Sequence, residues 1–196
     1  MATAMTDIMI PAPDIRRAEF GIRGTSPLIT HKWSEKAKKQ MLDKQMKKAA
    51  QAKEAKNPEQ DYLDSIYRFP DGGCGFPAVG FKAAMVRAGK SLGLVMTDLR
   101  AAFHINGERG VDGEDLIRIL GEPSMREDMV RIGQGTSDIR YRAEFVEWSA
   151  VIPVRFNARN ISEEQLASLL VQAGFGTGIG EWRPEKDGSF GMWEIA

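Results

Sequence analysis

The 22 residues from Gly174 to Ile195 hold the residue types that most suggest chemistry. Four glycines at every second position precede an aromatic and two cationic side chains: Gly174, Gly176, Gly178, Gly180, Trp182, Arg183 and Lys186. Glycine tolerates positive φ and lets another backbone approach closely, and successive exposed amides form a concavity that suits anions. A tryptophan face beside positive charge is a pairing that holds single-stranded nucleic acid. We therefore predict a cradle for a sugar-phosphate chain here; a helix end with a tight turn is the plainer interpretation.

A second candidate is the lysine-rich stretch from Lys32 to Lys56. It contains nine lysines against three acidic residues, a local excess of six positive charges. Its composition favours a helix, but the apolar stripe is thin, so packing would add little stability. The shortage of acidic partners favours contact with a polyanion, and a solvated surface helix is the alternative. The residues predicted to make this contact are Lys32, Lys36, Lys38 and Lys39.

Arginines recur in the region from 107 to 147. Short predicted strands, separated by turns at Glu122-Pro123 and at 133–137, suggest hairpins that project from a sheet. Five arginines lie on or beside these strands: Arg118, Arg126, Arg131, Arg140 and Arg142. Phosphate contact explains them about as well as ordinary exposed strand charge does.

Regular elements must position these groups. Alternation predicts strands over 18–29, 98–107, 147–159 and 189–195, with a turn at Ser26-Pro27 in the first. Helical spacing predicts a helix in 76–92, entered through Pro77, and a second helix that begins at a capping box of Ser162 and Gln165 and stops at Gly174. The order strand, helix, strand, strand, helix, strand is an α+β, ferredoxin-like or RRM-like βαββαβ plan. Two insertions, a lysine-rich one over 31–70 and β-hairpins over 107–147, would interrupt this single domain of residues 1–196.

Composition narrows the class of protein. The chain has 196 residues, 42% hydrophobic and 28% charged, which is typical of one globular domain. Its formal net charge is zero, so affinity for nucleic acid requires uneven placement of charge. One cysteine and two distant histidines give no metal-ligand spacing, and we expect neither a metal nor a cofactor. No stretch approaches 18 apolar residues, so we expect no membrane association and a cytoplasmic location.

Two motifs resemble a known family. The glycine-rich loop between the second helix and the last strand, GFGTGIGEWRPEKDGSFG, resembles the signature of the RAMP superfamily of CRISPR-associated proteins. The segment FPAVGFKAAMVRAG is similar to the RAMP segment in which a proline precedes a small-residue turn and a basic helix. Lys82, Arg87 and Lys90 would be the basic residues of that helix. Together the motifs cover about a fifth of the chain.

The backbone subunit of Cascade-type effectors is the nearest comparison. The resemblance implies an RRM-like palm, a finger region at the lysine-rich insertion and a thumb or web at the hairpins. It also implies an RNA-binding, RNA-guided ribonucleoprotein: copies stack as a filament-like homo-oligomer along a guide RNA, with other effector subunits, and pair it with complementary target DNA or RNA. This chain is shorter than typical backbone subunits, which suggests a compact phage or mobile-element relative.

The sequence is also compatible with two other functions. A phage-type single-stranded DNA-binding or annealing protein would use the same groove without a guide. An RNA-processing endonuclease of the same superfamily is a third possibility, but Asp61, Asp64, Asp71 and His31 show no catalytic partner in their spacing. We therefore expect no catalytic activity.

Overall fold

A four-stranded antiparallel sheet forms the centre of the molecule. The computed structural model describes residues 11–33, 35–47, 56–131, 135 and 137–196. The strands of this sheet follow the order β11-β1-β10-β5. They are β1 (Ile15–Gly24), β5 (Phe103–Ile105), β10 (Ser149–Asn157) and β11 (Trp193–Ile195). With α3 (Ala78–Ser91) after β1 and α5 (Glu163–Gly176) after β10, this is the predicted ferredoxin-like α+β fold.

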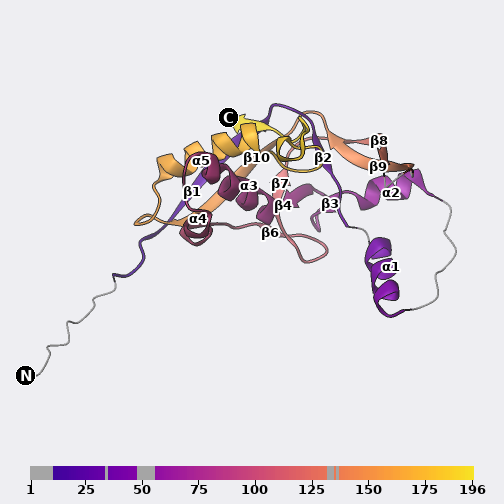
Figure 1. The fold of residues 1–196 in the computed structure, drawn as a ribbon, viewed down its shortest axis with the longest axis horizontal. Helices are drawn as coiled ribbons and strands as arrows, with labels where there is room; N and C mark the ends of the chain where they lie inside the picture. The colour runs from indigo at the N-terminus through magenta and orange to yellow at the C-terminus, as the bar shows by residue number, and fades with distance from the viewer. Residues whose placement is uncertain (1–10, 34, 48–55, 132–134, 136) are drawn as a thin grey trace, which may run out of the picture.

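The core lies between one face of this sheet and the two helices. Ala150, Ile152, Val154 and Phe156 alternate along β10 and are buried, as the period-2 pattern predicts. Helices α3 and α5 lie side by side over that face (Figure 1). The capping box at Ser162 is present, with its hydroxyl accepting from the Gln165 amide. Because the helices cover only one face of the sheet, the β10 residues that alternate with the buried ones point to the opposite face. We call this the open face.

Two smaller sheets hold the remaining strands. One contains β2 (Leu28–Thr30), β9 (Ser137–Phe145) and β8 (Pro123–Arg131), in that order. The other contains β3 (Tyr67–Arg68), β4 (Cys74–Pro77), β7 (Asp115–Ile119) and β6 (Glu108–Arg109). The β6–β7 and β8–β9 pairs are hairpins, and the first joins the central sheet through a bridge between Leu120 and Ser149. Both hairpins fall in the region where the sequence predicts them.

Three helices belong to neither layer. They are α1 (Glu35–Gln45), α2 (Pro58–Asp64) and α4 (Met96–Ala102), and a single 3-10 turn, η1 (Pro184–Lys186), follows the glycine loop. Helix α2 packs on β9, whereas α1 stands apart from the sheets (Figure 1). Met41 and Leu42 of α1 are accordingly exposed.

The structure corrects two local predictions and confirms a third. Residues 98–102, predicted as the start of a strand, belong to α4, and only Phe103–Ile105 pair with β10. The turn predicted at Ser26-Pro27 is present between β1 and β2, and β2 leaves the central sheet to pair with β9. Helix α5 does not stop at Gly174 but continues to Gly176. Gly174 is instead a packing position, since a Cβ there would lie 2.1 Å from the Trp193 carbonyl oxygen.

Candidate nucleic-acid interface

A row of basic side chains crosses the open face of the central sheet. Arg17 of β1 lies directly opposite Arg155 of β10, and Arg155 lies directly opposite His104 of β5. Neighbouring strands are about 4.8 Å apart, so the three side chains are adjacent. Both arginines are exposed, and neither forms an ion pair with any residue that the structure describes. We call Arg17, Arg155 and His104 the basic row.

The basic row places like charges in direct cross-strand register, an arrangement that is destabilising by itself. Its electrostatic effect is visible at His104. Partial burial, followed by the positive charges of Lys82 and Arg155, lowers the pKa of His104 below its ordinary value. An anion bound across the row would relieve this repulsion, and phosphate is the anion that paired arginines bind best.

Lys82 extends the basic row around the edge of the sheet. Its Nζ donates to the Arg100 carbonyl oxygen at 2.9 Å and lies 3.2 Å from Nδ1 of His104. Because an ammonium group only donates, Nδ1 accepts and the imidazole proton of neutral His104 is on Nε2. The same ammonium lies 5.9 Å from the centre of the Phe103 ring, and desolvation lowers the pKa of Lys82. Lys82 thus fixes the orientation of His104.

The two other predicted cations of α3 have different surroundings. Arg87 pairs with Glu185 of η1 at 2.8 Å, and Arg183 pairs with the same carboxylate at 3.0 Å. Arg183 also donates to the Gly180 carbonyl oxygen at 3.0 Å. Arg87 and Arg183 therefore hold the C-terminal segment against α3. Lys90 and Lys186 are exposed.

The glycine loop is not the exposed-amide cradle that the sequence predicts. The amide of Gly178 donates to the Ala173 carbonyl oxygen at 2.8 Å, that of Ile179 to Gly191 at 3.0 Å and that of Glu181 to Ile29 at 3.0 Å. These donors are satisfied inside the protein and are not available to an anion. Gly178 and Gly180 have φ of +66° and +75°, which explains the residue type by local backbone geometry.

The solvent exposure of the glycine-loop residues differs from one position to the next. Gly176 is exposed at the end of α5, Gly178 is buried, and Gly180 is half-buried. Trp182 is 42% exposed and has φ of +53°, an uncommon value for a residue other than glycine. Contact of Gly176, Gly178, Gly180, Trp182, Arg183 or Lys186 with RNA stays a prediction.

The hairpin arginines divide into two kinds. Arg126 pairs with Asp128 at 2.9 Å and Glu144 at 2.7 Å, and its guanidinium lies 4.9 Å from the centre of the Phe190 ring. Arg142 is 2% exposed, and its burial lowers its pKa. It lies 3.4 Å from Asp128 and 3.8 Å from Glu181. These two arginines therefore hold the β8–β9 hairpin to the C-terminal segment.

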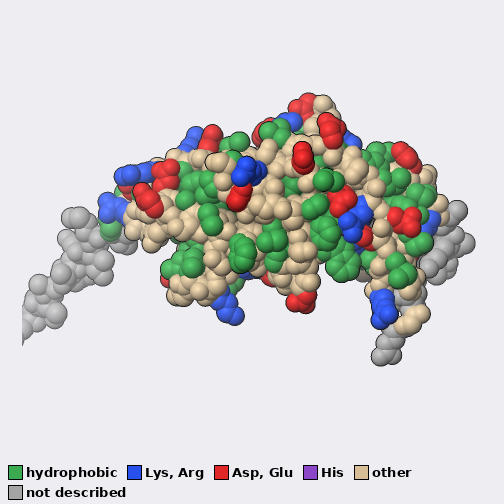
Figure 2. Space-filling view, turned by 90° about the horizontal axis from the view of Figure 1, so that it is seen from above, with side chains coloured by type: hydrophobic (Ala, Val, Ile, Leu, Met, Phe, Trp, Pro, Cys, Tyr) green, Lys and Arg blue, Asp and Glu red, His purple; other side chains and the backbone are tan. Residues whose placement is uncertain are grey.

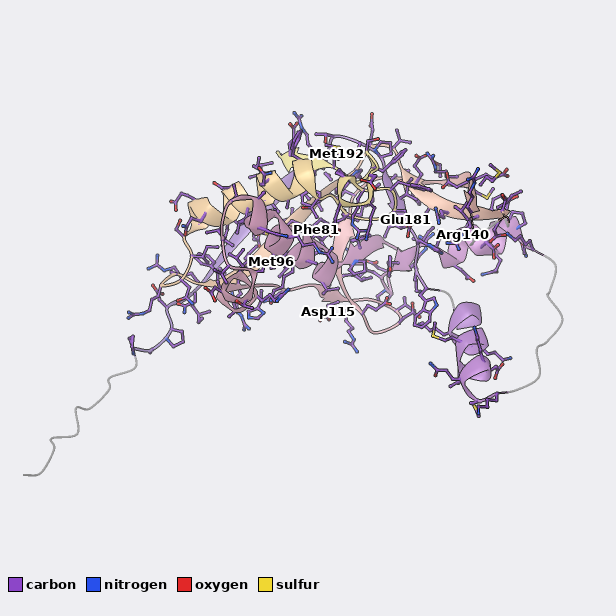
Figure 3. All side chains as sticks on the ribbon, viewed as in Figure 1. Phe81, Met96, Asp115, Arg140, Glu181 and Met192 are labelled. Atoms are coloured by element: carbon purple, nitrogen blue, oxygen red, sulfur yellow. The ribbon has the colours of Figure 1, made fainter. Side chains whose placement is uncertain are left out.

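The outer part of the hairpin keeps its positive charge nearer to solvent. Arg140 is half-buried and lies 3.9 Å from Asp138, and Arg131 is exposed at the end of β8. Figure 3 shows Glu181 on the side of the molecule where Arg140 lies. A hydrogen bond from His31, outweighing the effect of burial, and then the charge of Arg142 hold the pKa of Glu181 below its usual value.

The lysine-rich stretch is only partly described. Lys32 forms an ion pair with Asp112 of the β6–β7 turn. Lys36, Lys38 and Lys39 lie on α1, and Lys39 is exposed. Residues 48–55 lie outside the described part of the chain. On the face that Figure 2 shows, blue and red side chains intermix without one continuous basic surface. On that face, therefore, the described cations do not form one cluster.

Sequence reasoning assigned none of the three members of the basic row to the site. The alternation of buried and exposed residues could have placed all three on the open face. It could not have shown that they are neighbours, because strand register is not local information.

No protein-family profile matches the sequence, and no curated protein does so either. Among solved structures the chain is similar to Cmr6 from Pyrococcus furiosus, a CRISPR-associated RAMP-type protein, with a TM-score of 0.44 and 11% sequence identity. The match covers 94% of this chain and 100% of that one. Among the described residues no helix is long and apolar enough to cross a membrane, and no group of ligands suits a metal ion.

Proposed function

We propose that this protein binds single-stranded RNA across the open face of its central sheet. The observation that carries the proposal is the basic row, in which one histidine and two exposed arginines, neither paired with a carboxylate of the described residues, cross three neighbouring strands. Phosphates of a strand that runs over the sheet would each meet one of these side chains. Contacts to the backbone carry affinity without carrying sequence information.

The RNA in this proposal is a guide, bound by several copies that lie side by side and present it to a complementary target. The family-like motifs of the glycine loop and of α3 support this more specific function. In the fold these motifs meet at the junction between α3, α5 and the C-terminal segment, where Arg87 and Arg183 pair with Glu185. Protein contacts would hold the guide in shape while base pairing recognises the target.

The test is to purify the protein from its native host and to sequence the nucleic acid that accompanies it. A defined small RNA, in a complex with several copies of the chain, is the expected result. Heterogeneous single-stranded DNA would contradict the guide function and support the DNA-binding alternative. Absence of bound nucleic acid, together with no affinity for RNA oligonucleotides in vitro, would contradict both.

We also propose that the protein does not cleave RNA. Two of the three acidic residues considered for catalysis have structural partners: Asp71 accepts from the Gly73 amide and pairs with Arg118, and Asp64 accepts from Gln60. His31 pairs with Glu181. Incubation of the purified complex with target RNA and a divalent metal should leave the RNA intact, and discrete products would overturn this proposal.

A further inference from the structure

A cleft of about 280 Å³ opens beside the basic row. Its apolar lining comes from Val151 and Pro153 of β10 and from Leu116, Ile117 and Leu120 in and after β7. Four polar side chains also line it: Glu19, Asn106, Glu108 and Arg118. The cleft exists because β5 and β7 approach the same edge of β10 at different points. The backbone N–H of Asn106 donates to the Pro153 carbonyl oxygen at one end, and Leu120 forms a β-bridge with Ser149 at the other.

The position of the cleft follows from strand register. Glu19 lies opposite Pro153 just as Arg17 lies opposite Arg155, two residues further along the same strands. Two residues of a strand span about 7 Å, so the cleft is one step from the basic row on the same face. A phosphate on the arginines would leave its attached base within reach of the cleft.

The size and surface of the cleft fit a single base. Sites for drug-sized ligands measure about 300–1,000 Å³, so this cleft is too small for more than a small planar group. Val151 and Leu120 line the cleft together and are 51% and 56% exposed. Adjacent exposed aliphatic side chains of this kind suggest a surface that a ligand covers. These side chains would contact the flat face of a ring.

The polar groups select which base can enter. An ionised carboxylate only accepts hydrogen bonds, so it favours a base edge that carries donors. Glu108 is already engaged, since it accepts from Arg118 at 3.3 Å. Glu19 has no ion-pair partner among the described residues, and its carboxylate is free to accept two parallel hydrogen bonds. Guanine presents two such donors side by side, N1–H and the N2 amino group, whereas uracil presents one donor between two acceptors.

We propose that this cleft binds one base of the RNA strand held by the basic row and selects guanine through Glu19. The proposal rests on the function proposed above, because the strand is held there by Arg17 and Arg155. It adds a base preference to a surface that otherwise recognises only the sugar-phosphate backbone. Asn106 would donate or accept at the remaining edge of the base.

The test compares labelled ten-nucleotide RNAs in fluorescence anisotropy at one salt concentration. One RNA contains only uridine, the second has guanosine at every third position, and the third has inosine in place of guanosine. The wild-type protein should bind the guanosine RNA about tenfold more tightly than the uridine RNA. Inosine lacks the N2 amino group, so its affinity should lie between the two.

Glu19→Gln should reduce the guanosine preference to about twofold or less, because an amide offers one acceptor where the carboxylate offers two. Glu147→Gln is the matched control, since Glu147 is exposed, lies outside the cleft and loses the same charge. An unchanged preference in Glu19→Gln, or no preference in the wild type, would overturn the guanine assignment. Failure of the proposed function is a different result: none of the three RNAs binds, or Arg17→Ala/Arg155→Ala leaves all affinities unchanged.

Discussion

Replacement of Arg17 and Arg155 together by alanine should make RNA binding less sensitive to salt. Each arginine that contacts a phosphate of a single strand contributes about 0.7 to the slope of log affinity against log salt, because it displaces condensed counterions. Two lost contacts should lower the slope by about 1.4. Between 50 and 200 mM salt, the wild-type affinity should then fall about sevenfold more than that of the variant.

The structure provides a matched control on the same strand. Arg16 and Arg23 are exposed in β1, but each has a carboxylate partner: Arg16 lies 2.8 Å from Asp14 and Arg23 lies 2.6 Å from Glu194. Arg16→Ala/Arg23→Ala removes the same charge from the protein and should leave the slope nearly unchanged. The assay is fluorescence anisotropy with a labelled single-stranded RNA over a salt series.

Two results would refute the assignment of the basic row. One is an equal change of slope in both double variants, which would show that only net charge matters. The other is a wild-type slope in Arg17→Ala/Arg155→Ala. Misfolding is not expected to obscure the result, because the substitution removes a cross-strand pair of like charges. Urea unfolding should give a midpoint no lower than that of the wild type.

Three further predictions concern the rest of the molecule. Gly174→Ala should lower the free energy of unfolding by about 1–3 kcal/mol, because the added Cβ would overlap the Trp193 carbonyl oxygen. Gly176→Ala, at an exposed helical position, should not lower it, and urea denaturation of both variants measures the difference. Ser162→Ala removes the helix cap and should cost about 1 kcal/mol in the same assay, and a value near zero would contradict the role of the cap. The pKa of His104 is lowered in the free protein and should rise when RNA binds, because phosphate favours the imidazolium form. NMR titration of His104 with and without RNA measures this change. An unchanged pKa would mean that the RNA strand binds elsewhere.

The free protein also has a defined pH response at His104. A histidine whose pKa is lower in the folded state than in the unfolded state binds fewer protons when folded, so it favours folding at high pH. That contribution is complete above about pH 6.5 and is lost as the pH falls through the lowered pKa of the folded state. RNA binding would oppose this loss by stabilising the charged form.

Several elements could be predicted because their signals are local. The capping box at Ser162, the entry of α3 through Pro77 and the alternation along β10 each depend on residues within a few positions of one another. Their order was sufficient to predict the ferredoxin-like plan. Local signals were misleading where tertiary packing overrides them. Gly174 is a common type of helix stop, yet α5 continues because Gly174 fits against Trp193.

The sequence by itself determined which residues are basic, which strand faces are apolar and in what order the elements follow. Only the tertiary structure decided that Arg17, Arg155 and His104 are neighbours, since strand pairing joins residues far apart in the chain and a shift of one position would turn each side chain to the opposite face. It also decided that the amides of Gly178, Ile179 and Glu181 in the glycine loop bind the protein rather than an anion. Their acceptors include Ile29, which lies about 150 residues earlier in the chain and reaches the loop only when β2 pairs with β9.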